Sequence, residues 1–257
     1  MSLIEATTNM FGGVMTTPES LPTDAGVFQQ QLRHSLPVWA SQGRRLVWLE
    51  VPLARANLIP TAVEAGFKFH HSSEDYLMLT YRLVEDAFIP PYATHYVGVG
   101  GVVLNERQEL LVVSEKYRRD LGKPAYKLPG GALHQGEHLL AGVVREVYEE
   151  TGVRAKFESL VCLRHWHGYR YGKSDIYFVC RLSPLSEELN IQAEEIEECL
   201  WMPVEAYLQS QYVGIFNKWI VRAALNSPGI IPTWIEGYNN PATHEFFMPE
   251  EIVINEE

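Results

Sequence analysis

Three glutamates stand close together near the middle of the chain, at Glu146, Glu149 and Glu150. At this spacing they share one face of a helix within a single turn. Because like charges so close weaken a helix, the pattern predicts a cation among them. Hard carboxylate oxygens favour Mg²⁺ or Mn²⁺, which keep water ligands and bridge substrate phosphates. The residue types therefore indicate metal-assisted chemistry on a phosphate compound.

An arginine and a fourth glutamate belong to the same segment. Arg145 precedes Glu149 by four residues, so it is predicted to orient that carboxylate while staying charged. Glu137, further upstream, is predicted either to bind Arg145 or to ligate a further metal ion.

Apolar residues and glycines give this segment its predicted shape. Valines at 143, 144 and 147 would anchor the opposite face of the helix. Gly152 suits a left-handed helix end. Gly130 and Gly131 follow Pro129 and allow a bend that brings main-chain groups near the metal.

From Gly130 the chain reads GGALHQGEHLLAGVVREVYEETGV, which matches G-x5-E-x7-R-E-U-x-E-E-x-G-U, with U apolar, at every defined position. This pattern resembles the Nudix box. The resemblance implies a phosphoanhydride hydrolase that uses a divalent metal to cleave the diphosphate linkage of a small-molecule nucleoside diphosphate derivative. It implies that Glu146, Glu149, Glu150 and Gly131 hold the metal, and that Arg145 and Glu149 belong to the catalytic set.

The general base is predicted to be Glu146 or a glutamate outside the box. Glu195 and Glu197, in AEEIEECLWMP, are the best candidates outside it, because related sequences read E-I-x-x-x-x-W at this place. The alternative is an exposed acidic loop.

The elements that must position these residues follow from periodicity and turn signals. We expect helices over 27–43, 54–66, the box, 204–210 and 214–226, and strands over 44–52, 67–71, 75–83, 96–105, 109–116, 153–167, 174–182 and 197–203. The predicted division is an N-terminal arm or edge element (1–23), a small α/β domain (24–90), a catalytic domain (91–228) and a C-terminal tail (229–257). By resemblance the fold class is α/β (α+β): a Nudix α/β/α sandwich with a mixed sheet, preceded by an acetyltransferase-like domain.

The segment VWLEVPLARANLIPTAVEAGFKFHHSSEDYLMLTYRL resembles the domain that precedes the catalytic domain in one Nudix branch, known from plants and from the animal growth-factor-antisense protein. Residues 27–83 contain no Gly-rich loop that would hold a pyrophosphate, so acetyl transfer is not expected. Packing or formation of a homodimer is the predicted role of this domain.

The choice of substrate is less constrained. The segment HGYRYGKSDIYFVCRLSPL resembles the same branch, several members of which hydrolyse ADP-ribose or NADH. Aromatic residues here would stack on a base or belong to the core, and basic residues would meet phosphates or face solvent. The candidates are Arg118, Arg119, Lys127, Trp166, Tyr169, Tyr171 and Lys173.

Two substrate markers match in part or not at all. The segment LLVVSEKYRRDLGKPAYKLPGG shares residues with the motif of coenzyme A-directed relatives but lacks its Thr-x-Arg core. The proline of an ADP-ribose-specific branch would fall at Gly168. Coenzyme A, a dinucleoside polyphosphate or an oxidised nucleotide therefore stays open as the substrate. A nucleotide-sensing regulator and a protein-interaction module are alternatives from a different class.

Composition limits the partners. A net charge of −11 argues against a nucleic-acid partner or an anionic membrane surface. Three cysteines without a C-x-x-C spacing, and no export signal, predict a cytoplasmic protein. His165 and His167 would share one strand face but lack a third zinc ligand, whereas His70 and His71 are expected on opposite faces.

Overall fold

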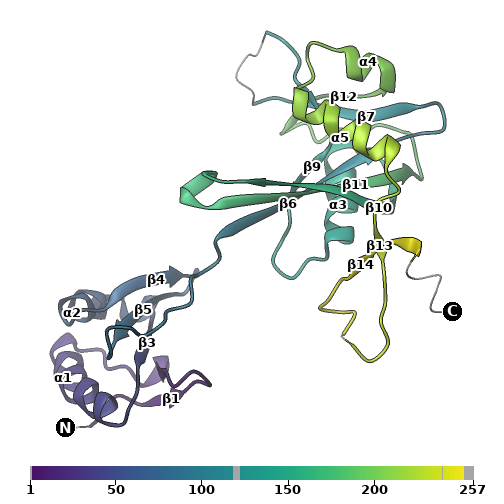
Figure 1. The fold of residues 1–257 in the computed structure, drawn as a ribbon. Coiled ribbons are helices and arrows are strands. Elements are labelled where there is room, and N and C mark those ends of the chain that lie inside the picture. The colour runs from purple at the N-terminus through teal and green to yellow at the C-terminus, as the bar shows by residue number, and fades with distance from the viewer. Residues whose placement is uncertain (1, 118–121, 239, 252–257) are drawn as a thin grey trace. The chain divides into compact units, whose positions relative to one another are not determined.

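The computed structural model describes residues 2–117, 122–238 and 240–251, so the predicted phosphate contacts Arg118 and Arg119 lie outside the described residues. The chain divides into two compact units, Met1–Ala93 and Thr94–Glu257 (Figure 1). The sequence-based boundary falls between residues 90 and 91. In the described ranges no helix has the length and apolar character needed to cross a bilayer.

The first unit is built on a five-stranded sheet in the order β1-β2-β3-β5-β4. Val47, Leu49 and Val51 alternate along β3 and point into a core that Phe28 and Leu32 of α1 complete. Its elements are β1 (Ala6–Thr8), β2 (Val14–Thr16), a 3-10 turn (Pro18–Ser20), α1 (Ala25–Ser41), β3 (Leu46–Pro52), a 3-10 helix (Leu53–Leu58), α2 (Ile59–Glu64), β4 (Lys68–Ser72) and β5 (Tyr76–Arg82).

Three local features of this unit bear on the sequence predictions. The helix expected over 54–66 is split, because Pro60 lacks an N–H and starts α2 afresh after the 3-10 helix. Part of the segment expected as an arm or edge element forms β1 and β2 at the sheet edge. The expectation for His70 and His71 was wrong, since a bulge after Phe69 brings their Nδ1 atoms to 2.6 Å.

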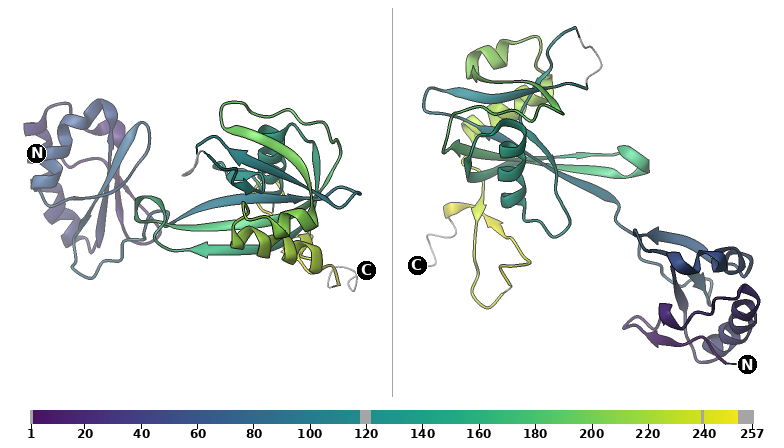
Figure 2. Two further views of the ribbon diagram at one scale, coloured as in Figure 1. Left: turned by 90° about the horizontal axis from the view of Figure 1, so that it is seen from above. Right: turned by 180° about the vertical axis from the view of Figure 1, so that it is seen from behind.

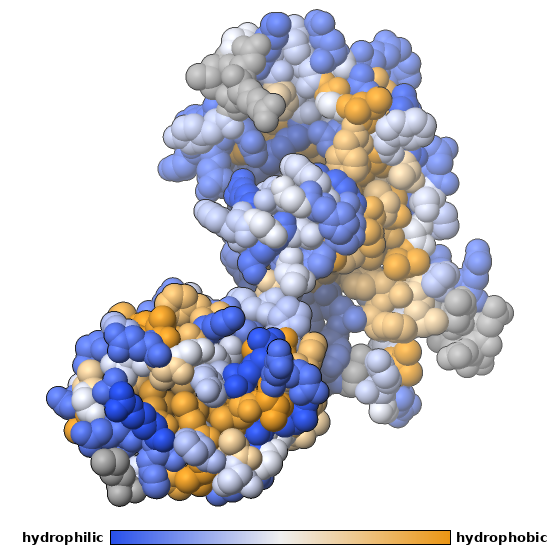
Figure 3. Space-filling view, turned by 60° about the vertical axis from the view of Figure 1, so that its left-hand side comes forward, coloured by the Kyte–Doolittle hydropathy of each residue, from blue (hydrophilic) through white to orange (hydrophobic). Residues whose placement is uncertain are grey.

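The face of this sheet opposite α1 is apolar. Leu46 and Trp48 alternate with the core residues of β3 and line a cavity of about 470 Å³. Apolar groups gather on the visible face of this unit in Figure 3. The cavity lies entirely within the first unit.

The second unit is a sandwich of helices around two sheets, β10-β11-β6-β9 and β12-β7-β8 (Figure 2). The first sheet is mixed, because β11 runs parallel to β6 but antiparallel to β10. These features confirm the predicted α/β class with a mixed sheet. The elements are β6 (His95–Val103), β7 (Glu109–Glu115), β8 (Tyr126–Lys127), β9 (Gly130–Ala132), α3 (Leu139–Thr151), β10 (Ala155–Trp166), a 3-10 turn (Arg170–Gly172), β11 (Ser174–Pro184), β12 (Ile196–Pro203), α4 (Val204–Gln209), α5 (Ile215–Asn226), β13 (Ile231–Pro232) and β14 (Phe247–Met248).

Strand β6 separates two cores. Val99 and Val103 pack in the cluster that holds Val143 and Val147 of α3. Val102 belongs to the cluster that contains Val221 of α5. Because strand side chains alternate, one face of β6 is committed to the box helix and the other to α5.

The C-terminal segment caps the box helix. The carboxylate of Glu245 accepts hydrogen bonds from the backbone N–H groups of Leu139 (2.5 Å) and Leu140 (3.1 Å). These donors have no partner inside the helix, and an anion there is favoured by the helix dipole. The other end closes at Gly152, whose φ of 75° is the left-handed conformation that its position predicts.

Candidate active site

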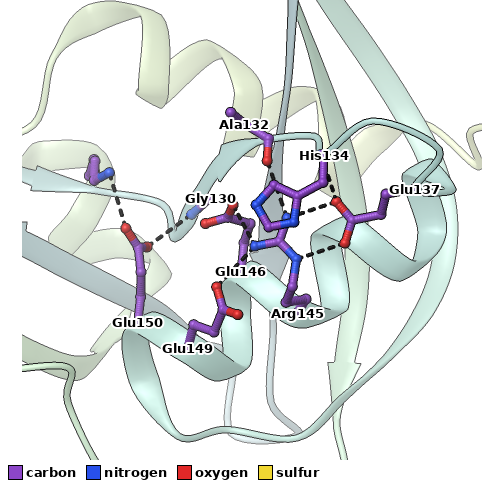
Figure 4. A network of polar contacts seen from close by, with 9 residues as sticks. Gly130, Ala132, His134, Glu137, Arg145, Glu146, Glu149 and Glu150 are labelled. Atoms are coloured by element: carbon purple, nitrogen blue, oxygen red, sulfur yellow. Dashed lines mark hydrogen bonds and ion pairs between the residues drawn. The ribbon is translucent and has the colours of Figure 1, made fainter. Parts of the chain in front are cut away.

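Arg145 organises the carboxylates of α3 (Figure 4). Its guanidinium grips Glu137 with two hydrogen bonds, Nε to Oε1 at 2.7 Å and Nη2 to Oε2 at 2.8 Å. Its Nη1 lies 2.9 Å from both Glu146 Oε1 and Glu149 Oε2. The hydrogen bonds from Arg145 hold the pKa of Glu137 at about 2, so that carboxylate stays ionised. One cation thus holds three anions in fixed positions.

Glu150 lies apart from this network and is buried. Its Oε2 accepts a hydrogen bond from the Gly130 N–H at 2.9 Å, and its Oε1 lies 3.4 Å from Lys127 Nζ. Lys127 Nζ is also 2.6 Å from Glu115 Oε1. Burial raises the pKa of Glu150 above its ordinary value, although the lysine and the N–H oppose that shift. Burial also lowers the pKa of Lys127, but the two carboxylates outweigh it and the net direction is upward.

The raised pKa of Glu150 predicts the acid side of the pH profile. At subsaturating Mg²⁺ the carboxylate must lose its proton to bind the cation, so activity should fall about tenfold per pH unit below a midpoint set by the raised pKa of metal-free Glu150. In Lys127→Met the cation that favours ionisation is gone, so the acid limb moves to higher pH. The measurement is kcat/KM against pH for both proteins; an acid limb at the same pH in both would contradict the assignment.

Two glycines let the main chain approach this helix. Gly130 has a φ of 151°, and a Cβ there would lie 2.3 Å from the carbonyl oxygen of Val99. A Cβ on Gly131 would lie 2.5 Å from Glu146 Oε2. Because residue 131 is a glycine, the Glu146 carboxylate has the space that a side chain there would fill. The backbone bend predicted after Pro129 is present at Gly130.

A cavity of about 860 Å³ runs along this face of the second unit. One end carries the carboxylates of Glu115, Glu146, Glu150 and Glu195 together with Lys127. The other end carries aromatic and mixed polar side chains from β6, β10, β11, the segment around the 3-10 turn and α5. The lining at that end includes Tyr96, Arg164, Tyr169, Arg170, Tyr171, Asp175, Tyr177, Phe216, Asn217 and Ile220.

The floor of the cavity is a tyrosine lying on glycines. Tyr177 of β11 faces Gly98 of β6, and a Cβ on Gly98 would lie 2.9 Å from its ring. A Cβ on Gly100 would lie only 2.0 Å from the Tyr177 hydroxyl, and a Cβ on Gly130 would lie 2.7 Å from it. Side chains at these two positions would therefore clash with the tyrosine. The alternating glycines thus lay the ring flat, with its hydroxyl toward the carboxylate end. Burial and the nearby charge of Glu150 raise the pKa of Tyr177, which keeps the hydroxyl protonated.

The carboxylate end fits a hard divalent cation that shares its shell with substrate. Glu146 and Glu150 offer oxygen ligands in the cavity, and the main chain at Gly131 is bare beside Glu146. Among the described residues, no three His, Cys, Asp or Glu side chains already form a site that could hold a metal ion. Mg²⁺ is typically bound in this partial way, by one or two carboxylates, waters and substrate phosphates.

Comparison with known proteins identifies the fold family. A family model described as "NUDIX domain" matches residues 94–222, and one described as "Nudix hydrolase domain" matches residues 4–83. The chain belongs to the Nudix hydrolase family. It is therefore a Nudix hydrolase, and enzymes of this family generally use divalent metal ions.

Several relatives cover most of this Nudix hydrolase. Nudix hydrolase 2 of Arabidopsis thaliana is 44% identical over 213 residues, which span 82% of this chain and 76% of that protein. The human protein named nucleoside diphosphate-linked moiety X motif 6 is 37% identical over 223 residues, 84% of this chain and 70% of that protein. A crystal structure of a MutT NUDIX hydrolase from Burkholderia pseudomallei aligns with 51% of this chain and 98% of its own, at 19% identity and a TM-score of 0.43.

The structure brings some of the sequence-predicted residues of this Nudix hydrolase together and leaves others outside. Glu146, Glu150, Gly131 and Glu195 line the cavity, as do Lys127, Tyr169 and Tyr171. Glu149 is about half exposed and is held by Arg145, outside the cavity lining. Trp166 and Lys173 are also absent from the lining, although the Trp166 ring lies 5.2 Å from that of Tyr169.

Sequence reasoning missed much of the aromatic end. Arg164, Asp175, Tyr177 and the α5 residues Phe216 and Asn217 were not among the candidates. Two signals pointed toward them: the Lys-Ser-Asp run that ends at Asp175, and the alternate glycines at 98 and 100. A glycine at every second strand position leaves space on one face for a large neighbouring side chain.

The pair formed by His165 of β10 and His167, which follows the strand, has a third histidine beside it. His95 of β6 places its Nε2 2.9 Å from Nε2 of His165, and the His167 ring lies 4.2 Å from that of His165. The described residues nevertheless contain no group of three that could hold a metal ion.

Proposed function

We propose that this Nudix hydrolase uses Mg²⁺ or Mn²⁺ to cleave the diphosphate linkage of a nucleoside diphosphate derivative, with ADP-ribose or NADH favoured. One observation carries the proposal: a single cavity joins the carboxylate end to an aromatic end. A molecule with a diphosphate between a base and a second group matches that division. Residues 167–185 resemble a branch of which several members hydrolyse ADP-ribose or NADH, and this resemblance supports the same substrates.

Each end of the cavity has a separate task in this proposal. Glu146 and Glu150 would hold the cation, whose charge offsets that of the phosphate oxygens. Arg145 keeps Glu146 in place through its Nη1 contact. Glu195 lies on the cavity wall, and in this proposal its carboxylate would accept a proton from an attacking water. Lys127, held between Glu115 and Glu150, prevents these two anions from repelling one another.

The direct test offers four substrates to the purified protein with Mg²⁺ or Mn²⁺. These are ADP-ribose, NADH, coenzyme A and a diadenosine polyphosphate, and the nucleotide products are separated and quantified. We expect AMP from ADP-ribose or NADH at the highest kcat/KM. If the protein hydrolyses none of them, the proposed activity is contradicted. If it prefers coenzyme A, the favoured substrates ADP-ribose and NADH are wrong.

Removal of divalent cations is expected to lower turnover to the background rate. In the proposal the cation is held partly by water and substrate, so it should exchange readily with solvent. The rate should therefore fall as the chelator concentration rises. Adding Mg²⁺ or Mn²⁺ back should restore the rate. The check is initial rate against free metal concentration, and full activity in excess chelator would rule out the metal role.

A cytoplasmic location, a homodimer and the lack of a nucleic-acid partner stay predictions from the sequence.

A further inference from the structure

An acid and a base are paired within the aromatic end of the cavity. Arg164 Nη2 donates to Asp175 Oδ2 at 2.5 Å, and both residues line the cavity. The Asp175 side chain is only 8% exposed. Within the described part of the chain this is the hydrogen bond that the pair makes, so Asp175 Oδ1 and Arg164 Nη1 keep capacity for a ligand. Arg164 Nε is buried without a partner, which leaves the guanidinium under-bonded.

Aromatic rings enclose this pair. The Arg164 guanidinium carbon lies 5.3 Å from the ring centre of Trp166, 5.4 Å from that of Tyr177 and 5.2 Å from that of Phe216. These contacts fix the guanidinium by cation–π attraction. In the sheet, Asp175 sits directly between Trp166 on β10 and Tyr96 on β6. The carboxylate therefore lies among aromatic residues, on which a flat group can stack.

The free atoms of the pair form an acceptor beside a donor. Asp175 can only accept hydrogen bonds when ionised, and Arg164 can only donate. A nucleobase edge complementary to them carries an amino donor next to a ring-nitrogen acceptor. Adenine has this edge at N6 and N1, and cytosine has it at N4 and N3. Hypoxanthine has the size of adenine but carries a carbonyl acceptor and an N–H donor in the same two places.

We propose that the Arg164–Asp175 pair selects the base of the substrate by reading an amino-and-ring-nitrogen edge, with Asp175 accepting from the amino group and Arg164 donating to the ring nitrogen. The inference rests on the proposed function, because it assigns the base of the nucleoside diphosphate to the aromatic end. A mismatched edge leaves buried polar groups unpaired, which sites of this kind reject strongly.

The test compares ADP-ribose with the same compound carrying hypoxanthine, for wild type and for Asp175→Asn. Wild type should prefer the adenine compound by about 10- to 100-fold in kcat/KM. An asparagine can turn its amide to donate, so the variant should lower this ratio to near one or invert it. An effect confined to folding or packing would lower both rates equally and leave the ratio unchanged, which would overturn the inference. Glu188→Gln, an exposed substitution of the same type, should retain the wild-type ratio.

Binding of AMP, IMP and CMP by calorimetry gives a measurement independent of turnover. We expect AMP to bind at least tenfold more tightly than IMP, and the difference to vanish in Asp175→Asn. CMP stronger than AMP would assign the site to cytosine derivatives. If wild type turns over neither ADP-ribose nor its hypoxanthine analogue but still binds AMP more tightly than IMP, the proposed activity on ADP-ribose fails while the inference stands. Equal affinity of wild type for AMP and IMP would contradict the inference.

Discussion

Glu146→Gln is expected to lower kcat by about a thousandfold while leaving the fold intact. The Glu146 side chain is 14% exposed, lines the cavity and fills the space beside Gly131. Glutamine keeps its shape but removes the charge that would hold a cation and stabilise the reacting phosphate. Losses of about 10²- to 10⁴-fold are typical when a charged catalytic group is neutralised. The measurement is steady-state turnover of ADP-ribose with Mg²⁺, with circular dichroism as the check on folding.

Two further glutamate variants sharpen this result. Glu188→Gln changes an exposed residue and should retain wild-type kcat, so a comparable loss there would show that the assay reports something other than the site. Glu149→Gln separates two roles. The sequence predicts Glu149 as a metal ligand, whereas the structure places its carboxylate on Arg145, outside the cavity lining. A loss as large as that of Glu146→Gln would favour the ligand role. A kcat for Glu146→Gln within tenfold of wild type would remove Glu146 from the reaction.

The part of the carboxylate end that α3 supplies lies in a short stretch of sequence, whereas Glu115, Lys127 and Glu195 come from outside it. Glu146, Glu149 and Glu150 fall on one helix, and the carboxylate partners of Arg145 lie within eight residues of it. Local spacing is sufficient for such contacts, because helix geometry alone decides which side chains meet. The same reasoning located the five long strands of the second unit, whose apolar residues follow strand periodicity, but not its short strands β8, β9, β13 and β14. For this reason the sequence alone predicted the candidate metal ligands on the box helix and the metal-assisted hydrolysis that they indicate.

The aromatic end depends on how distant strands pair. Asp175 meets Tyr96 only because β11 runs parallel to β6 in one particular register. A shift by one residue would turn Asp175 to the opposite face of the sheet, and a single sequence does not specify that register. The wall from α5 and the cap from Glu245 likewise come from segments far along the chain. The base-reading residues were therefore beyond local reasoning, except for the glycine alternation and the Lys-Ser-Asp run.

Arg145→Met should produce the largest loss of stability. The substitution keeps an unbranched chain of similar length but removes the cation that contacts Glu137, Glu146 and Glu149. The three carboxylates are then partly buried without a counter-charge, and breaking such a network typically costs about 3 kcal/mol or more. For a unit of this size that corresponds to a drop of about 6–12 °C in the Tm of its unfolding transition. Differential scanning calorimetry in chelator measures it.

Divalent cations should partly reverse this loss, because an ion that binds the native state stabilises it and the freed carboxylates offer it more negative charge. We therefore expect Mg²⁺ to raise the Tm of Arg145→Met by more than it raises that of wild type. Arg154→Met, at an exposed arginine just beyond α3, is the matched control and should change the Tm by about 1 °C or less. An Arg145→Met variant no less stable than this control would show that the carboxylates are compensated without the guanidinium. Equal responses to Mg²⁺ would place the cation away from Glu146 and Glu149.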